Sequence, residues 1–163
     1  MAAFVYAFPV DRLLHAFKHH GRLELAEWGA GAILAERAHH RGAHRPDRLI
    51  AMPLASERQR ERGYNQAFEI ARAIGERLRV PLLSKGVKRL RAAPPQAALP
   101  WSERAKNVRG AFACELDLAG MNVAIVDDVM TTGASLAELA KTLRRAGAAR
   151  VQSWVVARTL PPD

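Results

Sequence analysis

The sequence has little cysteine and no long apolar run. Cys114 is its single cysteine, which excludes an internal disulfide and a zinc site built from several cysteines. No stretch approaches the ~20 consecutive apolar residues that a membrane-spanning helix needs. The opening MAAFVYAFPV is apolar, but no basic region precedes it and no cleavage-type sequence follows, so it does not resemble a signal peptide. These absences predict a cytoplasmic protein without membrane contact.

Acidic residues are also scarce, since 16 Asp and Glu stand against 25 Lys and Arg. The basic excess lies in residues 37–109, which hold 17 basic and 6 acidic residues, whereas the rest of the chain holds 8 and 10. Such a stretch could attract a polyphosphate or a nucleic-acid backbone. A GC-rich coding sequence would also explain it, because 20 of the basic residues are Arg and 5 are Lys. Charge alone therefore leaves the function class open.

The 163 residues, of which 49% are hydrophobic, fit one domain with a substantial core. Apolar residues spaced i, i+3, i+4, i+7 predict a short helix that ends near Gly21: Val10, Leu13, Leu14 and Phe17. A second helical pattern runs from about Leu23 to Ala38. The polar segment 39–47 then separates an N-terminal helical region, residues 1–45, from the main region, residues 46–163.

The main region alternates between predicted strands and helices. Buried strands are expected at RLIAMP (48–53), MNVAIVD (121–127) and VQSWVVA (151–157). Asn65 is placed to cap a helix with one apolar face, formed by Phe68, Ala71, Ile74 and Leu78. Another helix, closed by Gly147, has its apolar face at Leu136, Leu139, Ala140 and Leu143. Strand, helix and strand in succession form a βαβ unit, so we expect the α/β class with a parallel sheet.

Residues 84–110 show little apolar periodicity and include the loop-like RAAPPQAALP. We expect a long loop here, with a short helix from Ser102 through Lys106. A loop of this length inside a compact domain is usually functional or mobile.

The segment VAIVDDVMTTGAS (123–135) runs from a buried strand into the start of a helix, where ligands bind in open α/β sheets. Gly133 allows a tight turn and a close approach of phosphate to the backbone. The amides of residues 131–135 would form a concave set of donors at the positive end of the helix dipole. The sequence therefore predicts a phosphate-binding loop formed by Thr131, Thr132, Gly133, Ala134 and Ser135.

Two adjacent carboxylates, Asp127 and Asp128, precede this loop. They suit a ligand that also carries hydroxyl groups, since they can accept hydrogen bonds from a ribose diol. In that position they would stabilise positive charge that develops at the anomeric carbon. A helix-capping loop would explain Thr132 and Ser135 but not the acidic pair. Together the two features predict a phosphoribosyl-binding site with Asp127 and Asp128 as catalytic residues.

The segment 123–135 resembles the phosphoribosyl pyrophosphate signature of type I phosphoribosyltransferases. More narrowly, the chain resembles the ComF family, phosphoribosyltransferase-like proteins associated with competence and DNA uptake. The similar stretches are FKHHGR (17–22), MPL (52–54), RERGYNQA (60–67), QAAL (96–99), RAKNVRGAF (104–112) and GAARVQSWVVARTL (147–160). Members commonly begin with a cysteine-rich zinc ribbon, which this sequence does not contain.

The resemblance implies a Rossmann-like type I phosphoribosyltransferase fold, with a parallel sheet of about five strands under a small hood, here the helical residues 1–45. It implies a pyrophosphate-binding loop after the first core strand, from Pro53 and Leu54 to Arg58, and a flexible closing loop within 84–110. Magnesium held mostly by the ligand is also expected. Arg60, Arg62 and Asn65 are further pyrophosphate candidates, of which Arg62 is favoured because it lies in RGYNQ. Arg104 and Arg109 are candidates in the closing loop.

Several of these residues have a plainer alternative. Arg58, Arg60 and Arg62 could form a solvated charged turn, with Asn65 only capping a helix. Arg104 and Arg109 could be surface charges. The pairs His15 with His19 and His40 with His44 have a spacing that can bind zinc, but no acid or cysteine completes either set, which favours surface histidines.

Two function classes remain open. The first is an enzyme that displaces pyrophosphate from phosphoribosyl pyrophosphate with a base or another nucleophile. The second is a binding protein, either a sensor of phosphoribosyl pyrophosphate or a competence factor that binds single-stranded DNA, for which the basic stretch 37–109 argues.

Overall fold

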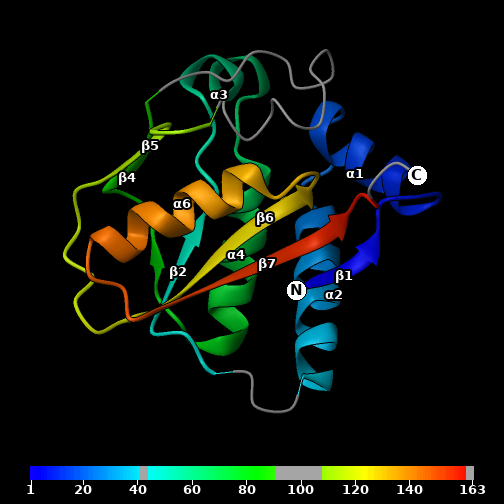
Figure 1. Ribbon diagram of the computed structural model, residues 1–163. Helices are drawn as coiled ribbons and strands as arrows, with labels where there is room; N and C mark the ends of the chain where they lie inside the picture. The colour runs from blue at the N-terminus through cyan, green and yellow to red at the C-terminus, as the bar shows by residue number, and fades with distance from the viewer. Residues whose placement is uncertain (41–43, 91–107, 161–163) are drawn as a thin grey trace.

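The computed structural model describes residues 1–40, 44–90 and 108–160. Five parallel strands form its main sheet, in the order β1–β7–β6–β2–β3 (Figure 1). Their bounds are β1 Ala2–Val5, β2 Arg48–Ala51, β3 Leu82–Leu83, β6 Asn122–Met130 and β7 Arg150–Arg158. The predicted α/β class, the five-stranded parallel sheet and the three predicted strands are confirmed.

Helices cover both faces of this sheet. α2 (Leu25–His39) and α4 (Gln66–Leu78) lie on one face, and α6 (Ala134–Arg145) lies on the other (Figure 1). The chain crosses from β1 to β2 and from β2 to β3 in one direction, but from β6 to β7 in the opposite direction. The strand order therefore reverses between the neighbours β2 and β6, and the carboxyl ends of such strands border the crevice where ligands bind.

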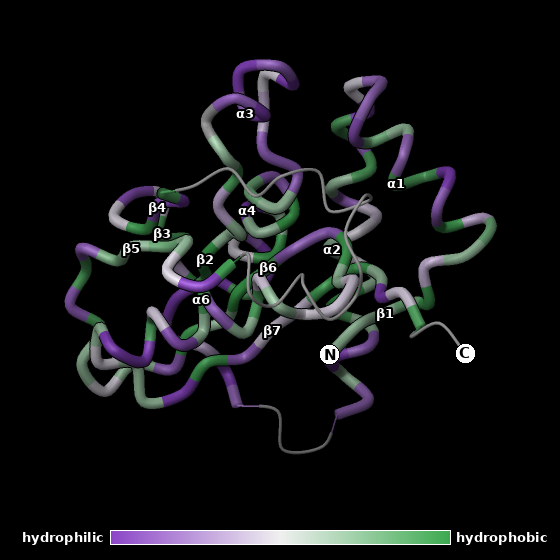
Figure 2. Tube along the Cα trace, turned by 45° about the horizontal axis from the view of Figure 1, so that its top comes forward, coloured by the Kyte–Doolittle hydropathy of each residue, from purple (hydrophilic) through white to green (hydrophobic). Residues whose placement is uncertain are grey.

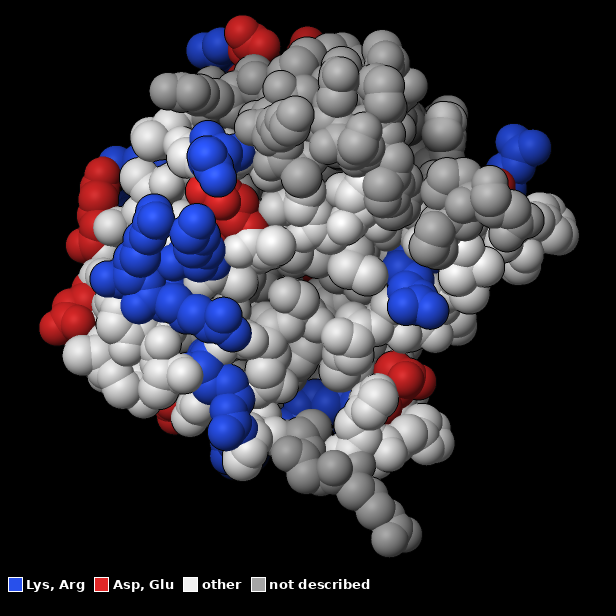
Figure 3. Space-filling model, viewed as in Figure 1, with Lys and Arg blue, Asp and Glu red and all other residues white. Residues whose placement is uncertain are grey.

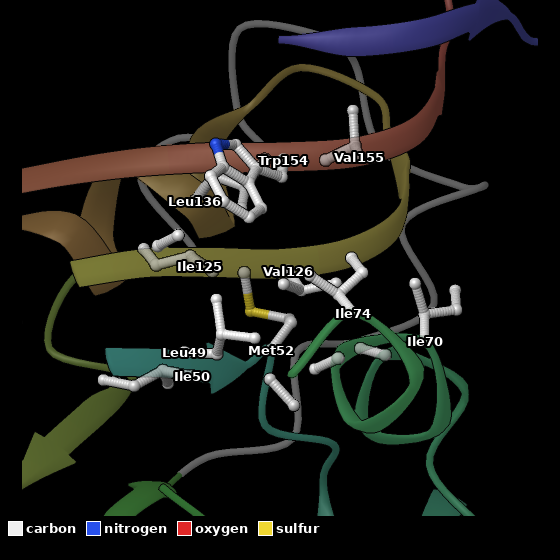
Figure 4. Packing of buried hydrophobic residues seen from close by; sticks show 14 of the residues in the cluster. Leu49, Ile50, Met52, Ile70, Ile74, Ile125, Val126, Leu136, Trp154 and Val155 are labelled. Atoms are coloured by element: carbon white, nitrogen blue, oxygen red, sulfur yellow. The ribbon is translucent and has the colours of Figure 1, made fainter. Parts of the chain in front are cut away.

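The core explains why β6 lies at the centre of the sheet. Residues 123–126 are fully buried, as expected for a strand that is covered on both faces. Successive side chains point to opposite faces, so Ile125 packs on the side of Leu136 while Val126 lies beside Ile74 of α4 (Figure 4). Burial of each such side chain stabilises the fold by ~1.5–3 kcal/mol. β6 is thus held from both sides, which gives its carboxyl end a defined position.

Two helices stand at the end of the molecule toward which the strands of the sheet run (Figures 1 and 2). α1 (Val10–His19) buries Leu14 and Phe17, as its apolar spacing predicts. α3 (Ser56–Arg62) is hydrophilic along its length (Figure 2) and ends at Gly63, whose φ is 77°. The sequence did not predict α3, because SERQRER has no apolar face to show a helical period.

The structure corrects two further expectations. The apolar opening of the chain forms β1, an edge strand of the main sheet, which the sequence did not predict. Residues 84–110 are not loop throughout, since β4 (Val87–Arg89) pairs antiparallel with β5 (Phe112–Cys114). A three-residue strand is too short to show alternation, and its partner lies more than twenty residues later. The expected helix from Ser102 to Lys106 lies outside the described residues, and within the described ranges no helix has the length and apolarity to cross a bilayer.

Candidate functional site

A cavity of about 320 Å³ opens at the point where the strand order reverses. The segment after β2 lines one side, and the end of β6 with the loop that follows lines the other. The predicted acidic and phosphate-binding residues and most pyrophosphate candidates lie around it: Pro53, Leu54, Arg58, Arg62, Asn65, Asp127, Asp128, Thr131, Thr132, Gly133, Ala134 and Ser135. Arg60 is not among the lining residues. Arg109 lies in an exposed turn and does not line the cavity, and Arg104 lies outside the described residues.

The loop from Thr131 to Ser135 has the geometry that anion binding requires. Gly133 is the N-terminal cap of α6 with φ at 75°, a left-handed conformation that favours glycine. The amide of Ala134 donates to Thr132 Oγ1 over 3.2 Å, which folds the loop around the helix start. Amides of a first helical turn have no intrahelical acceptor, and the helix dipole adds positive potential there. The cavity therefore presents donors to a phosphate group on this side.

The two acids occupy different environments, although they are neighbours in β6. Asp128 is buried, and its Oδ2 lies 2.9 Å from the ammonium of Lys18 on α1. Asp127 forms no ion pair with any described residue, and its Oδ1 accepts from the Asp128 amide at 2.9 Å. Burial, and then the charge of Asp128, raise the pKa of Asp127 well above its usual value. The site therefore holds one paired carboxylate and one that retains its proton more readily.

Lys18 is a site residue that the sequence did not identify. It lies in FKHHGR, one of the stretches that carry the family resemblance, but its helical pattern predicts only an exposed position on α1. Its contact with Asp128 joins residues 110 positions apart. Only the packing of α1 against the carboxyl end of the sheet brings them together.

Two buried hydrogen-bond donors in the lining of the cavity could bond to a polar ligand. Gln66 is 2% exposed and lines the cavity; its Oε1 accepts from Arg62 over 3.2 Å, but its Nε2 has no partner among the described residues. The hydroxyl of Thr159 is similarly buried without a described partner and belongs to a lining residue. A buried unpaired polar group costs about 1–3 kcal/mol, so a polar ligand in the cavity would remove a real penalty.

Arg89 of β4 is the cation that the described part of segment 84–110 contributes to the lining, since Arg109 does not line the cavity. Its guanidinium lies 5.4 Å from the centre of the Phe112 ring, across the β4–β5 pair. Burial, and then the charge of Arg58, lower its pKa, while Asp127 opposes that change. Among the described lining residues there are therefore three arginines and two acids, and this distribution suits a ligand with both phosphates and hydroxyls.

Asn65 combines the two roles between which the sequence could not choose. Its Oδ1 accepts from the Phe68 amide at 3.3 Å, which confirms the predicted cap of α4. Its Nδ2 donates to the Met52 carbonyl at 3.1 Å, and the side chain lines the cavity. Asn65 therefore ties the segment after β2 to the start of α4.

The described residues contain no group of three or more His, Cys, Asp or Glu that could hold a metal ion. The carboxylates among the described lining residues are those of Asp127 and Asp128, which suit a hard cation such as magnesium. Two adjacent carboxylates leave most coordination positions of such an ion to a ligand.

Comparisons with known proteins identify the domain family and the fold. The family model described as "Phosphoribosyl transferase domain" matches residues 66–160, which include β6, the loop 131–135 and α6. A glutamine phosphoribosylpyrophosphate amidotransferase from B. subtilis has a similar structure, with a TM-score of 0.50 and 21% identity, over 78% of this chain and 25% of that longer one. This likeness concerns the fold, which is that of type I phosphoribosyltransferases.

Relatives in sequence extend over almost the whole chain. The DNA utilization protein YhgH of Shigella flexneri is 39% identical over 95% of this chain and 70% of its own length. Competence protein F of Haemophilus influenzae is 31% identical over 94% of this chain and 69% of its own. The chain therefore belongs to the phosphoribosyltransferase domain family and, within it, to the ComF family of competence-associated proteins.

Proposed function

We propose that this protein binds phosphoribosyl pyrophosphate and transfers the phosphoribosyl group to a nucleophile, with release of pyrophosphate. The observation that carries the proposal is that one cavity joins the acidic pair of β6 to the donor loop at the start of α6. Carboxylates that accept from hydroxyls and amides that donate to a phosphate, with two residues between them in the sequence, match a ribose 5-phosphate in one orientation. The single cysteine is compatible with work in a reducing cytoplasm.

In this proposal each side of the cavity acts on one portion of the ligand. The amides of residues 131–135 bind the 5-phosphate, and Asp127 and Asp128 accept hydrogen bonds from the ribose hydroxyls. Arg58, Arg62 and Arg89 bind the pyrophosphate, together with the backbone at Pro53 and Leu54.

During the reaction the bond from the anomeric carbon to pyrophosphate breaks, and a bond to the nucleophile forms. Fixed carboxylates stabilise the positive charge that develops on the ribose between these events. Magnesium carried by the ligand would neutralise some of the charge of the leaving pyrophosphate. The residues of the cavity position the ribose and exclude alternative orientations.

Calorimetry with phosphoribosyl pyrophosphate tests the proposal. The double variant Asp127→Asn with Asp128→Asn should lose at least about 100-fold in affinity, since each charged hydrogen bond contributes ~1.5–3 kcal/mol. Asp117→Asn is the matched control, because Asp117 is exposed and does not line the cavity. Unchanged affinity in a double variant that keeps the circular dichroism of the parent would refute the proposal.

A second candidate function is binding of single-stranded DNA. It is favoured by the names of the relatives, which refer to DNA utilization and competence, and by the basic stretch 37–109. Basic side chains are not confined to that stretch, because they also gather over α6 (Figure 3), where Lys141, Arg144 and Arg145 are exposed. Binding through phosphates would fall steeply as salt rises.

Two measurements separate the candidates. Fluorescence anisotropy of a labelled oligonucleotide across a salt series measures DNA affinity, and a screen of nucleobases with phosphoribosyl pyrophosphate and magnesium measures pyrophosphate release. Pyrophosphate release without DNA affinity at physiological salt identifies the enzyme. DNA affinity at physiological salt without pyrophosphate release identifies the DNA-binding protein.

A further inference from the structure

A second cavity of about 480 Å³ lies between α1 and α3. The two helices stand apart from each other at the same end of the molecule in both views (Figures 1 and 2). We call this cavity the α1–α3 groove; its lining residues are Lys18, His19, Gly21, Arg58, Glu61, Arg62 and Tyr64. None of them falls within residues 66–160, where the family model matches.

The lining of the groove is strongly basic. Lys18, Arg58 and Arg62 face it from both helices, whereas Glu61 is the single acid among its described lining residues. His19 adds an imidazole that can donate a hydrogen bond. Guanidinium and ammonium groups that converge from two elements suit the tetrahedral oxygens of a phosphate.

The groove is continuous with the first cavity. Lys18, Arg58 and Arg62 line both, and the Lys18 ammonium lies 2.9 Å from Asp128, at the boundary between them. A ligand in the groove would therefore lie beside the acidic pair, on the side that α1 covers. In the proposed reaction this is the neighbourhood of the anomeric carbon.

We propose that the α1–α3 groove is a second phosphate-binding site and that the acceptor of the phosphoribosyl group carries a phosphate there. The acceptor role rests on the proposed function, whereas phosphate binding in the groove does not. A mononucleotide, the phosphorylated end of a strand and the backbone of a strand all supply this chemistry. His19 and Glu61 line the groove but not the first cavity, so they distinguish this site from the pyrophosphate side of the other one.

Glu61→Gln tests the groove because it removes the acid while keeping the shape of the side chain. With deoxythymidine monophosphate as the probe, we expect affinity to rise about 2- to 5-fold, as for removal of one repulsive surface charge. Glu57→Gln is the matched control, since Glu57 is also an exposed acid on α3 but does not line the groove. The affinity for phosphoribosyl pyrophosphate should change less than that for the nucleotide.

Decathymidylates with and without a 5′-phosphate distinguish the sources of the phosphate. Tighter binding of the phosphorylated strand identifies a terminal phosphate, and equal binding that Glu61→Gln strengthens identifies the backbone. The proposal is overturned if Glu61→Gln and Glu57→Gln have the same effect on every probe, or if Glu61→Gln alters only phosphoribosyl pyrophosphate binding.

The Asp127→Asn, Asp128→Asn variant separates this inference from the proposed function. Nucleotide binding that survives in this variant while phosphoribosyl pyrophosphate binding is lost supports two distinct sites. If the variant retains phosphoribosyl pyrophosphate and Glu61→Gln still strengthens nucleotide binding, the proposed function fails and the phosphate site in the groove stands. Loss of both ligands at once shows a single site and contradicts the groove.

Discussion

The first cavity and the α1–α3 groove lie side by side but are built in different ways. Nine consecutive residues, 127–135, supply the acids, hydroxyls and amides of the cavity, and their positions follow from a buried strand and a helix start. The groove instead takes Lys18 and Arg58, forty positions apart, from two helices at the end of the molecule. Its chemistry depends on long side chains rather than on backbone. Residues 127–135 of the cavity lie within the match to the phosphoribosyltransferase domain family, whereas the described lining residues of the groove lie outside it.

The largest expected effect comes from a substitution in the core beneath α6, which supports the cavity. Leu139 is fully buried in α6, so Leu139→Ala should lower the free energy of unfolding by about 2–5 kcal/mol. Urea denaturation measures this change. Leu160→Ala, at a site that is 55% exposed, should stay within about 0.5 kcal/mol. Equal losses in the two variants would show that the core beneath α6 is not what positions the loop.

Two glycines with a left-handed backbone allow the cost of backbone strain to be measured separately from the effect on ligand binding. Gly133 and Gly110 have φ values of 75° and 66°, so alanine at either position should cost about 1–2 kcal/mol. Only Gly133→Ala should weaken phosphoribosyl pyrophosphate binding, by about tenfold or more, because only Gly133 shapes the phosphate loop. Thermal unfolding and calorimetry on both variants test this. A matching loss of affinity in Gly110→Ala would mean that global strain, not the loop, governs binding.

The acidic pair predicts a pH dependence for the first cavity. The folded protein retains the Asp127 proton to a higher pH than the unfolded chain, whose carboxyl titrates near 3.8. The free energy of unfolding should therefore fall as pH rises from about that value through the raised pKa, and Asp127→Asn should be more stable than the parent at neutral pH. Affinity for phosphoribosyl pyrophosphate should rise over the same interval as the carboxylate forms.

Melting temperatures and calorimetry between about pH 4 and 8 measure both trends. Lys18→Met should shift both the fall in stability and the rise in affinity to higher pH, because the charge of Lys18 lowers the pKa of Asp127. Profiles that coincide for the parent and Asp127→Asn would assign the titration to another group.

The smallest effect concerns the link between α4 and the segment after β2. Asn65→Ala removes a helix cap and the bond to the Met52 carbonyl, which should cost about 1 kcal/mol. Gln59→Ala on exposed α3 is the control and should be near neutral. Denaturant unfolding distinguishes the two variants. An Asn65→Ala variant with the same free energy of unfolding as the parent would show that Arg62 and its neighbours hold this segment without the cap.

The first cavity could largely be predicted from the sequence, whereas the groove could not. The fold class, the central strands and the loop 127–135 were predictable, because a buried strand, a left-handed glycine and an acidic pair each have a recognisable local sequence pattern. β1, α3 and the β4–β5 pair were not, since short or wholly polar segments take their conformation from distant partners. Lys18, Gln66 and Arg89 were missed for the same reason: their roles exist only after the chain has folded around the end of the sheet.

The 2.9 Å ion pair between Lys18 and Asp128 has a thermodynamic consequence. A sugar that hydrogen-bonds to Asp128 competes with the ammonium, and a displaced ammonium becomes available to an anion on the other side. Reciprocity then requires each occupant to change the affinity of the other by the same factor. A single shared lysine would in this way favour the doubly loaded protein over either half-filled one.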